Sequence, residues 1–166
     1  MTADAQVPAN ARAVVVTVSD RSHSGVREDS NGPLLAAALR EMGFAVGDVV
    51  VVPDEVDAVV EALEEAVNDG VDCVVTTGGT GLSPRDITPE ATRLVIEREA
   101  PGIAETLRQD NRDAVPTAIL SRGVSGVIDS TLIVNLPGST GGVRDGIAVL
   151  RPVLGHAVAM LRGGDH

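Results

Sequence analysis

The chain has 166 residues, with 24 acidic and 13 basic side chains and a formal net charge of -11. That charge opposes a phosphate backbone, and an aromatic content of 1% leaves no stacking platforms, so nucleic-acid binding is not expected. All 13 basic residues are arginine, which excludes a P-loop lysine and a Schiff-base lysine. The length and a hydrophobic content of 43% predict one globular domain.

The compartment is predicted from cysteine use and from the absence of targeting segments. Cys73 is the only cysteine, so no intramolecular disulfide can form and a cytoplasmic location is expected. Residues 1–10 lack the basic and apolar regions of a signal peptide, and no apolar run approaches the roughly 20 residues of a membrane span. We expect no membrane partner and disordered tails at residues 1–11 and 163–166.

Short valine-rich runs alternate with amphipathic runs, a pattern typical of βαβ units around a buried parallel sheet. A strand is predicted over 13–19, and a polar loop follows it. Gly43 is expected to end the first helix, because glycine tolerates a positive φ. In chain order this half contains strand 13–19, loop 19–30, helix 32–42, strand 46–52, helix 56–67 and strand 72–77.

The second half continues the alternation. The next helix should begin at Thr88-Pro89-Glu90, where a hydroxyl precedes a proline and an acid. Pro152 should kink or split the terminal helix. The predicted elements are helix 88–99, helix 101–111, extended pieces at 118–121 and 127–128, strand 132–136, loop 137–142 and helix 143–161.

The loop after the predicted strand 72–77 is rich in glycine and threonine: residues 76–81 read Thr-Thr-Gly-Gly-Thr-Gly. Open parallel sheets bind ligands at the carboxyl ends of their strands. Glycines let the backbone approach a ligand, and consecutive N–H groups can bind an anion without lysine. This loop is interpreted as a phosphate or pterin loop, with an ordinary strand-to-helix turn as the alternative.

Two aspartates are candidate metal ligands at the same edge. Asp54 follows the second strand, and Asp86 lies in the loop before Thr88. Carboxylates from two strand ends can converge on one Mg²⁺, which completes its shell with water and substrate phosphates. The alternatives are a helix N-cap for Asp54, and a turn residue or an ion pair with Arg85 for Asp86.

A second glycine-rich loop occupies residues 135–142, after the last buried strand. Two such loops at one edge suggest a ligand with two polar ends. A helix-start loop capped by Ser139 or Thr140 is the alternative. The polar cluster at residues 19–22 adds a fifth segment to this edge, unless it is only a solvated loop.

Taken together, these motifs resemble the molybdenum cofactor biosynthesis family. The resemblance rests on Val-Ser-Asp-Arg-Ser near the start, Pro-Asp-Glu at 53–55, residues 76–91, Leu-Ser-Arg-Gly at 120–123 and Asn-Leu-Pro-Gly-Ser at 135–139. It covers roughly residues 12–162, which would form a molybdopterin-binding domain. The family includes bacterial molybdopterin adenylyltransferases of the short Mog/MoaB type and the equivalent domain of gephyrin.

The resemblance implies an α/β three-layer sandwich with a mostly parallel sheet flanked by helices, assembled as a homotrimer or hexamer. It also implies adenylylation of molybdopterin by MgATP, with release of pyrophosphate. Matched to the family's motifs, Asp54 and Asp86 would be catalytic and would hold Mg²⁺. The implied substrate-binding residues are Ser19, Asp20, Thr77, Gly78, Gly79, Thr80, Gly81, Ser121, Asn135, Pro137, Gly138 and Ser139.

A second function stays open at this stage. The loop reads Pro-Gly-Ser-Thr-Gly rather than Pro-Gly-x-Pro, which is similar to the short branch of the family. The alternative is therefore a non-catalytic paralogue that binds molybdopterin or a protein partner and acts as a carrier or regulator. A downstream molybdenum-insertion protein is a possible partner that the resemblance implies. With Phe44 as the only aromatic residue, either function would have to hold a pterin with loop backbone and polar or aliphatic side chains.

Overall fold

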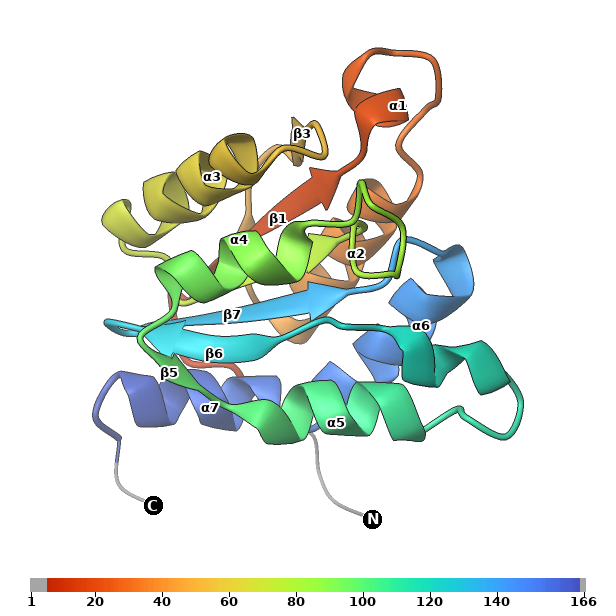
Figure 1. Ribbon diagram of the computed structural model, residues 1–166. Helices are drawn as coiled ribbons and strands as arrows, with labels where there is room; N and C mark the ends of the chain where they lie inside the picture. Colours follow the sequence, from red (N-terminus) through yellow and green to blue (C-terminus); the bar gives the residue numbers. More distant parts are fainter. Residues whose placement is uncertain (1–5, 165–166) are drawn as a thin grey trace.

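The computed structural model describes residues 6–164, in which a twisted sheet lies between two layers of helices (Figure 1). The strand order is β2-β1-β4-β7-β6-β5, with β3 also paired to β1. The strands β1 to β4 and β7 run parallel, whereas β6 is antiparallel to both of its neighbours. The strands are β1 (Arg12–Val18), β2 (Ala45–Val46), β3 (Val50–Val52), β4 (Cys73–Thr77), β5 (Arg98–Glu99), β6 (Ser125–Ile128) and β7 (Thr131–Leu136).

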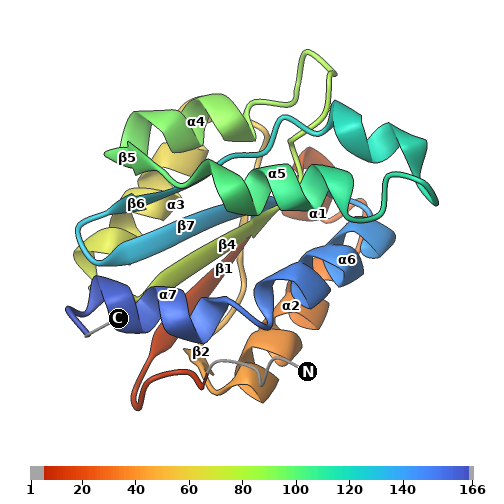
Figure 2. The ribbon, with the colours of Figure 1, turned by 90° about the horizontal axis from the view of Figure 1, so that it is seen from below.

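Helices cover both faces of this sheet, as Figure 2 shows from below. On one face α3 and α4 pack against β-strand residues such as Val16 and Val74, and on the other α2, α5, α6 and α7 pack against residues such as Val15 and Val75. The three-layer α/β expectation is thus confirmed. The helices are α1 (Asp20–His23), α2 (Asn31–Met42), α3 (Val56–Asn68), α4 (Thr88–Val95), α5 (Pro101–Gln109), the 3₁₀ helix η1 (Pro116–Leu120), α6 (Thr140–Leu150) and α7 (Leu154–Leu161).

The central strands are apolar on both faces because both faces are covered. In β4 the side chains of Cys73 and Val75 enter one core cluster and that of Val74 enters the other. All three are fully buried. Cys73 is therefore a core residue, and Phe44 is buried in the same cluster as Cys73.

The predicted strand 46–52 is interrupted. Arg12 pairs with Ala45 and Ala13 with Val46, but Val16 pairs with Val50. From the pair Ala13–Val46 to the pair Val16–Val50, β1 advances by three residues and the partner segment by four. One extra residue therefore forms a bulge between β2 and β3. The prediction of one continuous strand was wrong for this reason.

Three other boundaries differ from or sharpen the expectations. Helix α4 stops at Val95, because Ile96 is extended and β5 then pairs with β6. The predicted extended piece at 118–121 is mostly the 3₁₀ helix η1, which begins at Pro116. Pro152 does split the terminal helix, since α6 ends at Leu150 and α7 begins at Leu154.

The packed domain begins before residue 12. Ala11 is buried in the core, Val7 packs against it, and the carbonyl of Ala9 accepts a hydrogen bond from Arg162. The expected tail therefore does not extend to residue 11, and its residues 1–5 lie outside the described part. At the other end, Gly163 and Gly164 hydrogen-bond back to α7, and residues 165–166 lie outside the described part.

Candidate functional site

The loops that follow β1, β3, β4 and β7 converge at one edge of the sheet, as the strand pattern predicted. The two glycine-rich loops touch there. The Thr77 hydroxyl donates to the carbonyl oxygen of Pro137 at 2.8 Å, and a Cβ on Gly138 would lie 3.2 Å from the Cα of Gly78. The two loops therefore form one continuous floor.

Glycine is required at the turn after β4. Gly78 and Gly79 have φ values of +100° and +70°, a region that favours glycine. A Cβ on Gly78 would overlap the carbonyl oxygen of Val18, and one on Gly79 would overlap the Thr88 hydroxyl. Both glycines thus serve the tight packing of an ordinary turn, and both also line a cavity.

The second glycine loop is anchored to α2. The Asn31 amide donates to the carbonyl oxygen of Gly138 at 2.7 Å, and the Thr140 hydroxyl donates to the Asn31 oxygen at 3.0 Å. Ser139 caps α6 by accepting a hydrogen bond from Gly142 N at 3.0 Å. The capping alternative is confirmed for Ser139, which also lines a cavity.

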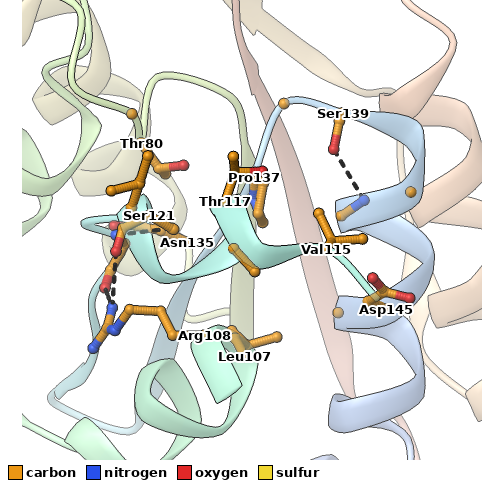
Figure 3. Close-up of a pocket in the computed structure, with 18 of the residues that line it drawn as sticks. Thr80, Leu107, Arg108, Val115, Thr117, Ser121, Asn135, Pro137, Ser139 and Asp145 are labelled. Atoms are coloured by element: carbon orange, nitrogen blue, oxygen red, sulfur yellow. Dashed lines mark hydrogen bonds between the residues drawn. The ribbon is translucent and has the colours of Figure 1, made fainter. Parts of the chain in front are cut away.

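The larger cavity at this edge has a volume of about 680 Å³. Figure 3 shows Thr80, Ser121 and Arg108 on one wall and Ser139 and Asp145 on the opposite wall. Aliphatic side chains complete the lining: Leu82, Leu107, Val115 and Leu120. Such a volume and such walls suit a small organic ligand.

A smaller cavity of about 210 Å³ lies on the other side of the glycine floor. Its lining is more polar and includes Ser19, Arg27, Asp29 and Asp54. Gly79, Asp86 and Gly138 line both cavities. The two spaces therefore meet at Asp86 and at the contact between the two glycine loops.

The two predicted carboxylates lie together at this junction. Asp54 Oδ2 accepts a hydrogen bond from Asp20 N at 2.9 Å, and Asp86 Oδ2 accepts one from Ser83 N at 3.0 Å. Burial raises the pKa of the Asp54 carboxyl, and the negative charges of Asp20 and Asp86 raise it further. In the hydrogen bonds of residues 6–164, Oδ1 of each carboxylate has no partner.

These two carboxylates fit Mg²⁺ only together with a ligand. Within the described residues, no group of three His, Cys, Asp or Glu side chains could hold a metal ion. Mg²⁺ commonly uses one or two protein carboxylates and takes its other ligands from water and substrate phosphates. The donor set thus matches a metal that arrives with a phosphorylated substrate.

The side chains of Asp20 and Asn135 are both hydrogen-bonded within the protein, and of the two only Asn135 lines a cavity, the larger one. Asp20 lines neither cavity, and its carboxylate accepts hydrogen bonds from Arg85 and from Asp54 N. The Arg85 hydrogen bond lowers the pKa of Asp20. The buried Asn135 amide bonds to Val124 N, Thr76 and Thr92. Asp20 therefore supports the site from outside the two cavities, whereas Asn135 lines the larger cavity with its amide already hydrogen-bonded.

Most of the other predicted residues lie at the strand edge, and Ser121, which only the family resemblance implied, lies beside them after η1. Ser19 lines the smaller cavity, although its hydroxyl also caps α1 by accepting from Ser22 N. The Ser121 hydroxyl accepts from Gly123 N at 3.3 Å and lines the larger cavity. Gly81, Thr80 and Pro137 also line the larger cavity.

Sequence reasoning missed the arginines of the site. Arg27 lines the smaller cavity and Arg108 the larger one. Arg122 lines neither of these two cavities, but it bonds to the loop that carries Asp86. Scattered arginines give no local pattern, and only the position of Arg122 after Ser121 in a motif could have drawn attention to it.

None of the helices within residues 6–164 is long and apolar enough to span a bilayer.

Comparison with known proteins places the chain in a family. Residues 14–156 match the family model of a probable molybdopterin binding domain. The chain is 38% identical over 154 residues to the molybdenum cofactor biosynthesis bifunctional protein of Synechococcus elongatus, an alignment that covers 93% of this chain and 48% of that protein. The chain thus spans about half the length of this relative.

Two further relatives are nearer to it in length. The molybdopterin adenylyltransferase of Helicobacter pylori (strain J99) is 38% identical, with 90% of this chain and 86% of that protein covered. The solved structure of the molybdopterin biosynthesis Mog protein from Mycobacterium ulcerans is 47% identical, with a TM-score of 0.87 and 91% and 99% of the two chains covered. The chain therefore belongs to the molybdopterin-binding-domain family of molybdenum cofactor biosynthesis proteins.

Proposed function

We propose that this protein adenylylates molybdopterin with MgATP and releases pyrophosphate. The observation that carries the proposal is the position of Asp86, which lines both the larger and the smaller cavity. A group transfer between two bound substrates needs their reacting phosphates at one place, and the junction at Asp86 offers such a place. The activity named for the Helicobacter pylori relative supports the same reaction.

The larger cavity is the proposed site of the pterin. Its volume of about 680 Å³ is within the usual range for small-molecule sites, and aliphatic residues such as Leu107 and Leu120 form much of its wall. Ser121 and Thr80 supply polar groups on one side. No aromatic side chain lines this cavity, so the pterin would contact main chain and aliphatic groups, as the composition predicted.

The smaller cavity and the junction are the proposed site of the phosphates and Mg²⁺. Asp54 and Asp86 would hold the ion, which when bound would neutralise phosphate charge. The raised pKa of Asp54 reflects burial and like charges, and a cation would relieve that repulsion. Exposed main chain at Gly79 and Gly138 would contact phosphate oxygens.

The reaction requires no protein nucleophile. An oxygen of the terminal phosphate of molybdopterin would form the new bond to the α-phosphorus of ATP, and the bond from that phosphorus to pyrophosphate would break. The chain's residues would bind, orient and stabilise charge, which is the main demand of phosphoryl-type transfer. Cys73 is buried in β4 and takes no part.

The test is AMP transfer from ATP to molybdopterin by the wild type and by Asp86→Ala. We expect the variant to remain folded and to lose transfer, because its carboxylate makes only a local bond to Ser83. Asp113→Ala is the matched control, since that side chain is fully exposed and lines neither cavity. Near wild-type transfer by Asp86→Ala would reject the assignment. Molybdopterin binding without turnover by the wild type would favour the non-catalytic alternative.

The proposed assembly is a homotrimer or hexamer, and the proposed partner is a downstream molybdenum-insertion protein. Exposed apolar side chains such as Leu82, Leu94 and Ile119 are compatible with an interface. Light scattering at micromolar concentration tests the assembly, and a dominant monomer would contradict it.

A further inference from the structure

The side chain of Arg122 contacts the loop that carries Asp86 at two points and the start of α4 at a third. Its Nε donates to the carbonyl oxygen of Gly81 at 2.8 Å, and its Nη2 donates to the carbonyl oxygen of Asp86 at 2.8 Å. Its Nη1 donates to the Glu90 carboxylate at the start of α4. In addition, its main-chain N–H donates to the carbonyl oxygen of Thr80 at 2.8 Å. One residue therefore connects the first glycine loop, the turn at Asp86 and α4.

The turn at Asp86 has few other attachments. Residues 82–85 are exposed. Two hydrogen bonds between Ser83 and Asp86 shape the turn from within, and they do not tie it to the rest of the protein. The ion pair between Arg85 and Asp20 does cross to another segment, but both side chains are largely exposed, and such pairs contribute little. Thr88 fixes the end of the loop, since its N–H and its hydroxyl donate to the carbonyl oxygens of Gly79 and Gly78 at 3.1 Å and 2.8 Å. Before Thr88, the side-chain hydrogen bonds that reach the main chain of residues 81–86 from another segment come from Arg122.

A second arginine holds the residues on either side of Arg122. Arg108, on α5, donates from Nη1 to the carbonyl oxygen of Gly123 at 2.9 Å and to that of Ser121 at 3.4 Å. Ser121 lines the larger cavity, and Asp86 lines both cavities. A continuous series of contacts therefore runs from α5 through Ser121 and Arg122 to Asp86.

We propose that Arg122 is a positioning residue that fixes Asp86 relative to the Ser121 wall of the larger cavity. The proposal rests on the proposed function, because it assigns Asp86 to the reacting phosphates and their metal ion. The two carbonyl contacts carry it rather than the bond to the half-exposed Glu90, since only they end on the loop. Lysine offers one ammonium group and cannot reproduce the planar set of donors.

The experiment compares Arg122→Lys and Arg122→Gln with wild type and with Arg93→Gln. Arg93 is a matched control because it also makes an ion pair near α4, with Glu99, and has no hydrogen bond to the Asp86 loop. Four quantities are measured: AMP transfer, Mn²⁺ binding in the presence of ATP by electron paramagnetic resonance, the rate of tryptic cleavage after Arg85, and amide hydrogen exchange across the sheet.

We expect the Arg122 variants to lower kcat by about 10-fold to 100-fold, because small displacements of positioned groups have effects of that order. The Kd for Mn²⁺ should rise by about fivefold or more, while the KM for molybdopterin changes by less than about threefold. Cleavage after Arg85 should become faster, since the turn loses its attachment. Arg93→Gln should match the wild type in all four measurements.

Wild-type Mn²⁺ affinity and wild-type cleavage after Arg85 in Arg122→Lys would overturn the proposal. So would a uniform increase of amide hydrogen exchange across the sheet, because that result would make the role of Arg122 one of general stability. If the wild type itself transfers no AMP, the proposed function fails, and the Mn²⁺ and cleavage measurements still decide whether Arg122 positions Asp86.

Discussion

Asp20 and Asp54 exchange hydrogen bonds between main chain and side chain: Asp20 N donates to Asp54 Oδ2, and Asp54 N donates to Asp20 Oδ1, both at 2.9 Å. The pair ties the end of β1 to the end of β3. It also orients the Asp54 carboxylate toward the smaller cavity, where that residue forms part of the lining. Arg85 compensates the charge of Asp20, and burial leaves Asp54 as the carboxyl with the raised pKa.

The first prediction concerns Asp54→Asn. A folded-state pKa above the ordinary value of 3.8 means that ionised Asp54 opposes folding once the pH exceeds that raised pKa. Removing the charge should therefore leave the free energy of unfolding at pH 7 unchanged or higher, since an asparagine oxygen can still accept from Asp20 N. AMP transfer should fall by about 100-fold or more.

Urea unfolding at pH 7 and at pH 4, with an activity assay, checks this prediction. Any gain in stability over the wild type should shrink at the lower pH, where Asp54 becomes protonated. A variant that is clearly less stable at pH 7, or one that keeps full turnover, would contradict it.

The second prediction concerns Asp72, which joins the start of β4 to the end of α7. Burial raises the pKa of Asp72, but hydrogen bonds from Arg162 and from Arg12 N, with the charges of both arginines, lower it more, so the net pKa is below 3.8. Ionised Asp72 therefore stabilises the fold above about pH 4, and this contribution is lost as the pH falls through the lowered pKa.

Asp72→Ala should reduce the free energy of unfolding by about 1.5–3 kcal/mol at pH 7. Asp69→Ala is the control, because its ion pair with Arg12 is exposed and should contribute at most about 1 kcal/mol. Urea titrations at pH 7 and pH 3 measure both, and the effect of Asp72→Ala should be smaller at pH 3. If the two substitutions lowered the free energy of unfolding equally at pH 7, the partly buried Asp72 would contribute no more to stability than the exposed Asp69, and the prediction would be wrong.

The third prediction concerns Gly78→Ala. The residue has φ of +100° and no room for a Cβ beside the Val18 carbonyl, so alanine should strain the turn by about 1–3 kcal/mol and separate the two glycine loops. Gly102→Ala on α5 meets no atom within 4 Å and should be neutral or slightly stabilising. Thermal unfolding of both variants distinguishes them. A Gly78→Ala protein as stable as Gly102→Ala would refute the steric argument.

The fourth prediction concerns Cys73. Burial raises the pKa of its thiol to about 12, so almost no thiolate forms at neutral pH. A colorimetric disulfide reagent should not modify the native protein within an hour at pH 8, and should modify it at once in 6 M guanidinium, on the order of one thiol per chain. Rapid labelling of the native protein would mean that β4 opens far more readily than its burial suggests.

Much of the fold could be predicted from local patterns. Valine-rich runs identified β1, β4 and β7, Gly43 ended α2 in a left-handed conformation, and Pro152 split the last helix. The predicted element boundaries that were wrong depend on pairing with other strands of the sheet. The bulge between β2 and β3 is set by their register with β1, and α4 ends at Val95 because residues 98–99 pair with β6.

The sequence by itself determined which strand-end loops of the candidate site lie together, because parallel strands must bring their carboxyl ends to one edge. It therefore placed Asp54, Asp86 and both glycine loops together. Only the tertiary structure decided what each polar group does, since a hydrogen bond is set by distance in space rather than along the chain. Arg122 reaches Gly81 across 41 positions, and Asp20 meets Asp54 across 34. Such contacts leave no periodicity in the sequence. They are nevertheless what distinguishes the residues that line the cavities from the residues that hold those linings in place.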